Sequence, residues 1–332
     1  MKNRNVTLYF ILSASILTIL GLSGLTLIPT EILVGLKNKA IKYLNMQHDY
    51  LLSSALFFSL LPTLIVLTID CIVLGYPNSA IKRLLKPSLT ARTDLILYLC
   101  VLTRTMPLVS IFVSAGTLYI FPKLFERYTD ISFKIQFDSP IIQFFFLVMV
   151  QDFVEYWRHR LAHRVSWWWQ LHKVHHSATE FNVITVARTH PLELAFSAML
   201  VYIPLSLIGL NVETFFIIKL FYSMQGKLQH SMINWRWGWV GKYIFLSPVD
   251  HRIHHSCEKE HWDKNFGHIT PLWDRLFGTW YDGDVVNETI NVTGNTHNKK
   301  GIINDLVFSQ LDFLKHLLLK KWSFSYGVRK KK

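Results

Sequence analysis

Residues 190–230 read HPLELAFSAMLVYIPLSLIGLNVETFFIIKLFYSMQGKLQH, and this stretch decides how the chain folds. Its apolar part runs from 194 to 229 and is about twice as long as the roughly 20 residues that one helical membrane crossing needs. The run is interrupted at 209–211, where glycine and asparagine favour a turn. We therefore expect a membrane hairpin that brings His190 and His230 out on the same side of the bilayer.

Four more apolar segments precede the hairpin, and they cover residues 8–28, 51–75, 95–121 and 140–157. The chain has 332 residues, 51% of them hydrophobic, which fits a polytopic membrane protein better than a soluble domain. The first segment has a basic start like that of a signal peptide. However, it is long for a signal core and lacks a small-residue cleavage site, so we interpret it as a membrane helix. Asp70 and Arg104 lie inside two of the segments, where they either pair or reach the interface.

Histidine clusters follow these spans. His159 and His163 come directly after the fourth span, HKVHH at 172–176 follows without another span, and HRIHH at 251–255 comes after the hairpin. Counting spans places all three clusters on one face of the membrane. The loop 77–93 shares that face and carries lysine and arginine without an acid, which marks the face as cytoplasmic.

The expected fold class is therefore all-α: a polytopic transmembrane helical bundle of four spans plus the hairpin, with a cytoplasmic, histidine-rich helical cap that binds metal. We divide the chain into an N-terminal transmembrane region, a catalytic domain, and a C-terminal part with an interfacial helix at 302–322 and a basic tail. The bounds of these three parts are 1–138, 139–285 and 286–332.

Charge and side-chain chemistry narrow the function further. The net charge of +13 is explained by a basic cytoplasmic face, so no nucleic-acid partner is expected. The three cysteines form no paired motif, and we expect free thiols. Two runs of tryptophan fit an aromatic belt at the membrane interface, namely Trp167, Trp168 and Trp169, and Trp235, Trp237 and Trp239.

The spacing of the histidines predicts metal binding. On a helix, H-x3-H and H-x2-H-H place their rings on one face, and neutral imidazole is a common ligand of transition metals. Three ligands from one turn can hold one metal, and the second box can hold another. Because a tetrahedral zinc site takes at most four ligands, eight converging histidines predict two metals. Zinc with hydrolysis and iron with O₂ activation both stay open at this point.

The order of the three boxes resembles the fatty acid hydroxylase/sterol desaturase superfamily of membrane di-iron oxygenases. The flanking residues agree with it: DFVEYWRHR at 152–160, RTHPLE at 188–193, DKNFG at 263–267 and WDRLFGT at 273–279. The resemblance covers about 140 to 282. It implies that the box histidines share a metal site and that the histidine ending the hairpin also binds metal. The implied ligands are His159, His163, His172, His175, His176, His230, His251, His254 and His255.

Residues around these ligands are expected to bind metal or to accept the second N–H of a ligand ring. The candidates are His190, His261, Asp152, Glu155, Glu193, Asp250, Asp263 and Asn265. His268 is interpreted as structural, and His48, His297 and His316 as unrelated to the site. No catalytic side chain is expected beyond the metal centre.

The resemblance implies two non-haem iron ions with O₂ as co-substrate, acting to hydroxylate or desaturate a C–H bond of a sterol or fatty-acyl-type lipid that enters from the bilayer. The sequence has no dinucleotide fingerprint, iron–sulfur cysteine cluster or haem motif, so we expect an external ferredoxin, cytochrome or reductase to supply electrons. The alternatives are a metal-dependent membrane lipid hydrolase and a non-enzymatic divalent-metal transporter. A bacterial inner membrane is favoured as the location, or the endoplasmic reticulum in a eukaryote.

Overall fold

The structure is a computed structural model that describes residues 56–103, 137–208, 212–283 and 297–319, with isolated positions at 30, 31, 34, 127, 128, 135 and 290. Within these residues the secondary structure is helical and contains no strand beyond one isolated bridge, which pairs Ser256 with Ile290. The all-α class predicted from the sequence is confirmed for this part of the chain.

The elements vary widely in length. The long helices are α4 (Leu61–Leu74), α6 (Leu89–Leu102), α8 (Pro140–Arg164), α10 (Pro191–Ile208), α11 (Val212–Gln229) and α15 (Ile302–Leu318). The short α-helices are α5 (Ala80–Leu85), α9 (Ser166–His172), α12 (Gly238–Tyr243), α13 (Pro248–His254) and α14 (Leu272–Leu276). The π-helix η1 spans Leu56–Leu60, and the 3₁₀ helices are η2 (Tyr76–Asn78), η3 (His175–Ser177), η4 (Thr185–Ala187) and η5 (Lys259–His261).

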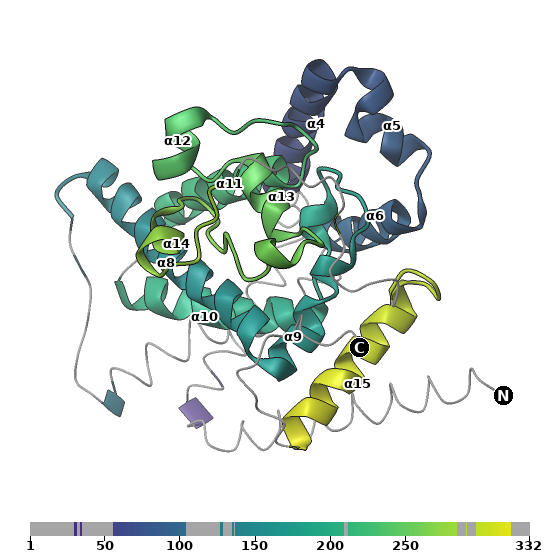
Figure 1. The fold of residues 1–332 in the computed structure, drawn as a ribbon. Helices are drawn as coiled ribbons and strands as arrows, with labels where there is room; N and C mark the ends of the chain where they lie inside the picture. Colours follow the sequence, from purple (N-terminus) through teal and green to yellow (C-terminus); the bar gives the residue numbers. More distant parts are fainter. Residues whose placement is uncertain are drawn as a thin grey trace.

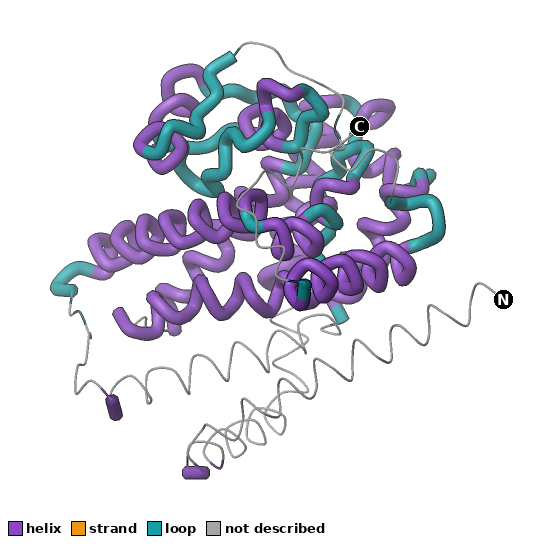
Figure 2. The backbone as a smooth tube through the Cα atoms, turned by 60° about the horizontal axis from the view of Figure 1, so that its bottom comes forward, coloured by secondary structure: helices purple, strands orange, loops and turns teal. Residues whose placement is uncertain are grey.

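Helices α8, α10 and α11 pack together, and the short helices α12, α13 and α14 with their loops lie on one side of them (Figure 1, Figure 2). A hydrophobic core joins α8, α10 and α11 through Leu147, Val201 and Ile218, and Ile269 from the loop-rich side completes it. Burial of these apolar side chains holds the loop layer against the helices. The histidine boxes therefore lie where the two layers meet.

Helix α8 connects the two layers. It begins with Pro140 at its first turn, where the missing N–H has no intrahelical partner to lose. Its 25 residues span about 37 Å at 1.5 Å per residue, which exceeds the roughly 30 Å of a bilayer core. The first turns expose Ile141, Ile142 and Phe145, whereas the last turns bury His159 and His163. One helix thus carries both a lipid-like surface and part of the polar site.

The predicted membrane spans are tested only in part. Among the described residues, Phe57–Leu74 is long and apolar enough to cross a membrane by length and composition. The segment 8–28 lies outside the described residues, and 95–121 is described only as far as residue 103. The hairpin segment contains two helices, but its turn at 209–211 also lies outside. The four spans and the hairpin therefore stay predictions.

Of the two charged residues inside the apolar segments, the structure describes Asp70 but not Arg104. Asp70 accepts a hydrogen bond from the backbone N–H of Ala80, with an O–N distance of 2.6 Å, and so holds the start of α5. Arg104, its suggested partner, lies outside the described residues. The carboxylate is buried together with a partner of its own, as a buried polar group requires.

The tryptophan runs are a correction to the sequence analysis. Trp168 and Trp169 are buried at 5% and 6% exposure, so they are not part of an interfacial belt. Trp169 packs against His163 and His172 instead, with ring centroids 5.2 and 6.3 Å away. Trp239 is 66% exposed and remains available to an interface. The first run is buried because α9 lies beneath α15, where Trp167 packs against Leu171 and Phe313.

Candidate metal centre

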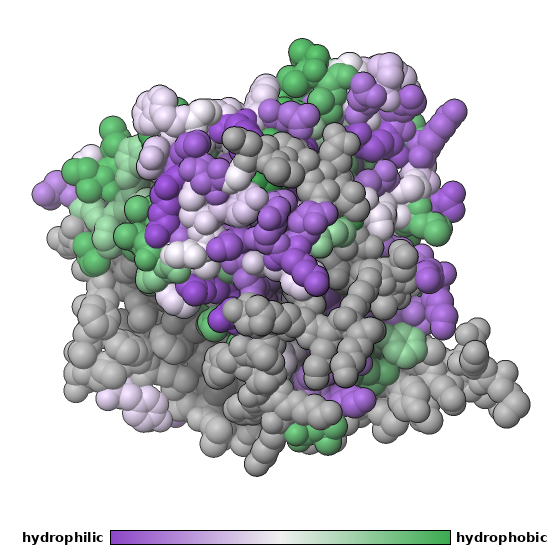
Figure 3. All heavy atoms as spheres, viewed as in Figure 1, coloured by the Kyte–Doolittle hydropathy of each residue, from purple (hydrophilic) through white to green (hydrophobic). Residues whose placement is uncertain are grey.

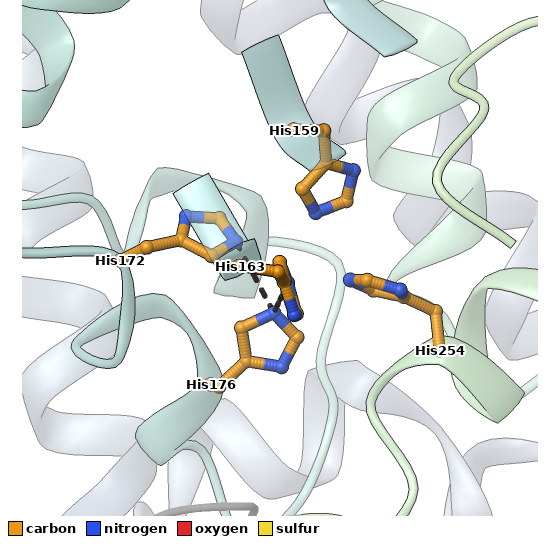
Figure 4. Close-up of side chains that lie close together, drawn as sticks. All are labelled: His159, His163, His172, His176 and His254. Carbon is orange, nitrogen blue, oxygen red and sulfur yellow. Dashed lines mark hydrogen bonds between the residues drawn. The ribbon is translucent and has the colours of Figure 1, made fainter. Parts of the chain in front are cut away.

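The nine predicted ligands come together in two adjacent groups. The first histidine group contains His159, His163, His172, His176 and His254, and the second contains His175, His230, His251 and His255. Within each group the potential ligand atoms lie within 4.8 Å of one another. Figure 4 shows the five rings of the first group converging, with His176 bonded to His163 and His172. His176 also stacks on His255 with ring centroids 4.1 Å apart, so the groups are in contact.

Each H-x-x-H-H box divides between the two groups, and this corrects the expectation of one metal per box. In HKVHH the outer pair His172 and His176 joins the first group, while His175 joins the second. In HRIHH the outer pair His251 and His255 joins the second group, while His254 joins the first. The two boxes are therefore interleaved. HKVHH does not form one continuous α-helix, because α9 ends at His172 and the 3₁₀ helix η3 begins at His175.

Backbone carbonyls fix the orientation of several rings. The Nδ1 atoms of His159, His175, His230 and His254 lie 2.9, 3.1, 2.7 and 2.7 Å from the carbonyl oxygens of Phe266, Arg188, Gly226 and Lys264. A carbonyl oxygen only accepts, so Nδ1 must carry the proton in each ring. In the neutral ring Nε2 then presents a lone pair.

This protonation makes the site fit a cation. His175 and His230 both have a protonated Nδ1, yet their Nε2 atoms face each other at 3.4 Å. Two lone pairs cannot hydrogen-bond to each other, and a metal ion between them resolves the conflict. The Nε2 atoms of His254 and His255 are buried without a hydrogen-bond partner in the described part of the chain. A bound metal ion would give these buried nitrogen atoms the partner that they lack.

Burial keeps the rings neutral. Desolvation lowers the pKa of His254 to about 3 and that of His230 to about 4. It also lowers the pKa values of His159, His163 and His251 well below 6.5, and neighbouring histidines add to the effect. Neutral imidazoles with free lone pairs bind transition metals without first releasing a proton. The groups are thus prepared for metal at neutral pH.

Carboxylates support the first histidine group. Glu193, at the start of α10, accepts from Nδ1 of His172 at 2.5 Å and is 1% exposed. Arg158 lies 3.7 Å from Glu193 and binds Glu155 on its other side at 2.5 Å. Asp263 lies 3.8 Å from Nδ1 of His163, beyond hydrogen-bond length, and pairs with Arg164 at 3.3 Å. Glu193 is therefore the carboxylate that orients a ring directly.

The other expected acidic and amide residues hold the surrounding backbone. Asp152 accepts from the N–H groups of Ile269 and Thr270 at 2.7 and 3.1 Å. Asp250 forms a capping box with Ser247 at the start of α13. Asn265 donates to the carbonyl of Asp250 at 3.1 Å and accepts from Tyr281 N–H at 2.9 Å. These hydrogen bonds go to backbone groups and to Ser247 rather than to the ligand rings.

His190 and His261 do not join either group. His190 Nε2 lies 3.1 Å from the carbonyl oxygen of Leu306, and its Nδ1 accepts from Leu192 N–H. His261 Nδ1 lies 2.8 Å from Ser256 Oγ. His268 stacks on Tyr222 with a centroid distance of 5.0 Å. His297 and His316 also lie outside the groups.

The C-terminal signature positions ligands through its backbone. Asp263 and Asn265 adopt positive φ angles of 59° and 54°, which acidic and amide residues tolerate. Between and after them, the carbonyls of Lys264 and Phe266 orient His254 and His159. Asp274 then accepts from the N–H groups of Phe266 and Gly267 at 2.8 and 2.7 Å. Sequence reasoning missed Asp274, although its place in WDRLFGT was a usable signal.

Gly267 is required by close approach. A Cβ at this position would lie 2.5 Å from the carbonyl oxygen of Thr270 and 2.9 Å from Asp274 Oδ2. Both distances are below any normal contact, so a larger residue would push the loop away from α8. The glycine in DKNFG thus serves the packing that orients His159.

Part of the chain is similar in sequence to known proteins. The fatty acid hydroxylase family model matches residues 144–279. Human alkylglycerol monooxygenase is 30% identical over 56% of this chain and 42% of its own length. The ornithine lipid hydroxylase OlsE of Rhizobium tropici is 32% identical over 48% of this chain and 47% of its own length. A very-long-chain aldehyde decarbonylase of Oryza sativa is 23% identical over 49% of this chain and 56% of its length.

Residues 144–279 are therefore a fatty acid hydroxylase domain, and the resemblance to the fatty acid hydroxylase/sterol desaturase superfamily is confirmed. The matches to the first two relatives span about half of their length or less. No solved structure matches the chain.

Proposed function

We propose that the chain is a membrane oxidoreductase that uses O₂ and external electrons to hydroxylate or desaturate a lipid C–H bond at two iron ions. The observation that carries this proposal is the pair of buried, adjacent histidine groups. Relatives named as lipid monooxygenases and hydroxylases support the reaction class. The names of these two relatives also favour a polar lipid, such as a glycerol ether or an amino-acid lipid, over a free hydrocarbon.

In this proposal each histidine group holds one iron. The bound irons would supply the redox chemistry that activates O₂ toward an apolar C–H bond. The chain's own residues have three tasks: the imidazoles hold the ions, the backbone carbonyls and Glu193 orient the imidazoles, and the packing excludes bulk water. Eight of the nine histidines are buried and His175 is partly buried, which serves the third task. No other side chain is assigned a catalytic role.

The hydrophobic exterior supports membrane placement of this centre. Ile141, Ile142 and Phe145 on α8 are 67%, 62% and 61% exposed, and Ile72 on α4 is 77% exposed. Figure 3 shows hydrophobic surface along the start of α8 and at the end of α4, with hydrophilic residues gathered between them. We propose that these helices and the α10–α11 hairpin lie in the bilayer and that the histidines lie at its cytoplasmic edge. A lipid would then reach the metals from the bilayer side.

The electron donor and the location are further parts of this proposal. We propose an acidic ferredoxin, cytochrome or reductase that binds the basic cytoplasmic face, because charge complementarity steers such encounters. The bacterial inner membrane is the favoured location. The three-part division at 138 and 285 is kept, with the matched range 144–279 inside the catalytic part.

The direct test is conversion of a lipid pool by purified, iron-loaded protein with O₂ and a chemical or enzymatic reductant. Product formation that requires both O₂ and reductant supports the oxygenase. His175→Ala and His254→Ala should each abolish turnover, whereas the matched control His316→Ala should retain it, because His316 only bonds to the carbonyl of Asp312 in its own helix. Lipid hydrolysis without O₂ would establish the hydrolase alternative instead. Metal flux across vesicles without lipid turnover would establish the transporter.

A further inference from the structure

A fully buried arginine adjoins the second histidine group. Arg188 is 0% exposed and pairs with Asp94, which is also 0% exposed, through an Nε–Oδ1 distance of 2.6 Å. Its other nitrogens donate to Thr90 O and Oγ1 at 2.6 and 2.7 Å, to Ser177 Oγ at 2.9 Å and to Asn298 Oδ1 at 3.0 Å. The planar guanidinium fixes all these partners in one geometry. A buried charge with so many partners is held rigidly.

The partners of Arg188 come from three distant parts of the chain. Thr90 and Asp94 lie on α6, Ser177 follows the HKVHH box directly, and Asn298 precedes α15. Two of these parts lie outside the fatty acid hydroxylase match at 144–279. The N–H of Asn298 donates in turn to Asp305 at 2.8 Å, and its side chain donates to the carbonyl of Ser177 at 2.8 Å. The arginine is therefore a joint between the matched domain and both flanking regions.

The joint acts on a ligand through the backbone. The carbonyl oxygen of Arg188 accepts from Nδ1 of His175 at 3.1 Å, and this contact directs His175 Nε2 toward His230. His175 is the one residue of HKVHH that belongs to the second histidine group. Because Arg188 also binds Ser177, it ties both ends of the segment 177–188 around this ring. The position of its carbonyl depends on where its guanidinium is held.

We propose that Arg188 is a positioning residue for His175 and that Thr90, Asp94 and Asn298, through Arg188, set the metal affinity of the second histidine group. The inference rests on the proposed metal centre and adds that residues outside the matched domain complete it. No ring of the first histidine group is hydrogen-bonded to Arg188 in the described residues, and the joint reaches this group through Ser177, which follows His176. Its affinity should therefore be less sensitive to the same substitutions.

Conservative substitutions of the partners of Arg188 test this role without creating a large cavity in the core. Thr90→Val removes one acceptor and keeps the shape of the side chain. Asn298→Gly removes a second acceptor of Arg188 together with the donor to the Ser177 carbonyl, and glycine suits the positive φ of 65° at this position. Thr93→Val is the matched control, because Thr93 is also buried on α6 and, among the described residues, bonds to the carbonyl of Leu89 in its own helix rather than to Arg188. Thermal unfolding of the metal-free variants reports whether they are folded.

The measurement is a Co²⁺ titration of the full-length protein in detergent, followed by visible absorbance. In a His159→Ala background the second histidine group keeps its full ligand set, and in a His251→Ala background the first one does. We expect the Thr90→Val/Asn298→Gly pair to weaken Co²⁺ binding about tenfold in the first background, the lower end for loss of an outer partner of a ligand. In the second background the pair should weaken binding less, and Thr93→Val should have no effect in either.

Two results would overturn the inference and separate it from the proposed function. Equal weakening in both backgrounds, or none in the His159→Ala background, would show that the joint does not position His175. Failure of the unmutated protein to bind two Co²⁺ ions would instead reject the metal centre itself, and the inference with it.

Discussion

Replacement of Glu193 by glutamine tests how the first histidine group is oriented. Glu193 Oε1 lies 2.5 Å from His172 Nδ1, and the carboxylate is 1% exposed. Glutamine keeps the volume and one acceptor oxygen, but it removes the charge and places an amide donor near Arg158, which lies 3.7 Å away. Loss of an outer carboxylate partner weakens metal binding about 10- to 100-fold. At about 1.4 kcal/mol per factor of ten, this corresponds to about 1.4–2.8 kcal/mol.

The assay is competition for Fe²⁺ against a coloured chelator under anaerobic conditions. Glu155→Gln is the control, because Glu155 binds the opposite side of Arg158 at 2.5 Å and is not hydrogen-bonded to a ring of either group in the described residues. We expect Glu193→Gln to lose affinity for one of two irons and Glu155→Gln to keep both. Unchanged affinity in Glu193→Gln, or an equal loss in both variants, would refute the role of this carboxylate.

Three further predictions follow from the same geometry. Gly267→Ala should lower turnover at least tenfold with lipid binding retained, because the added Cβ would lie 2.5 Å from Thr270 O and must displace the loop that orients His159; wild-type kcat would contradict this. Asp94→Asn should lower the free energy of unfolding by about 3–5 kcal/mol, because Arg188 loses its buried counter-charge; a chemical denaturation midpoint equal to that of Thr93→Val would exclude it. The metal-free protein should lose stability as pH falls from about 6.5 to about 4, since the unfolded chain takes up protons on histidines that burial keeps neutral, with the pKa of His230 at about 4 in the fold. Unfolding curves recorded across this range that show constant stability would contradict the burial of neutral rings.

The sequence predicted the membership of the site but not its division. H-x3-H and H-x2-H-H spacing indicates which histidines share a helix face, and the nine expected residues are those that converge. Spacing along one helix cannot tell which rings from different helices meet. The assignment of His175 and His254 to opposite groups depends on how η3 and α13 meet in the fold. That information lies in the tertiary structure.

The supports of the site were harder to predict than the ligands. Four rings are oriented by backbone carbonyls, which every residue possesses, so the sequence gives no signal for Phe266, Lys264, Gly226 or Arg188 in this role. Carboxylates were expected there on general grounds, and Glu193 is hydrogen-bonded to the ring of His172. The pairing of Asp94 with Arg188 joins residues far apart in sequence. Trp168 and Trp169 were assigned to the interface because a run of tryptophan residues has the same sequence whether it is buried in a core or lies in an interfacial belt.

The central claim is that two interleaved histidine groups bind two irons. The most direct measurement is elemental mass spectrometry of the full chain, purified in detergent without added metal or chelator, alongside His175→Ala and His254→Ala. The account predicts about two irons per chain in the unmutated protein and loss of metal in each variant. Two zinc ions that iron does not replace, or an absence of bound metal even after reconstitution, would contradict it.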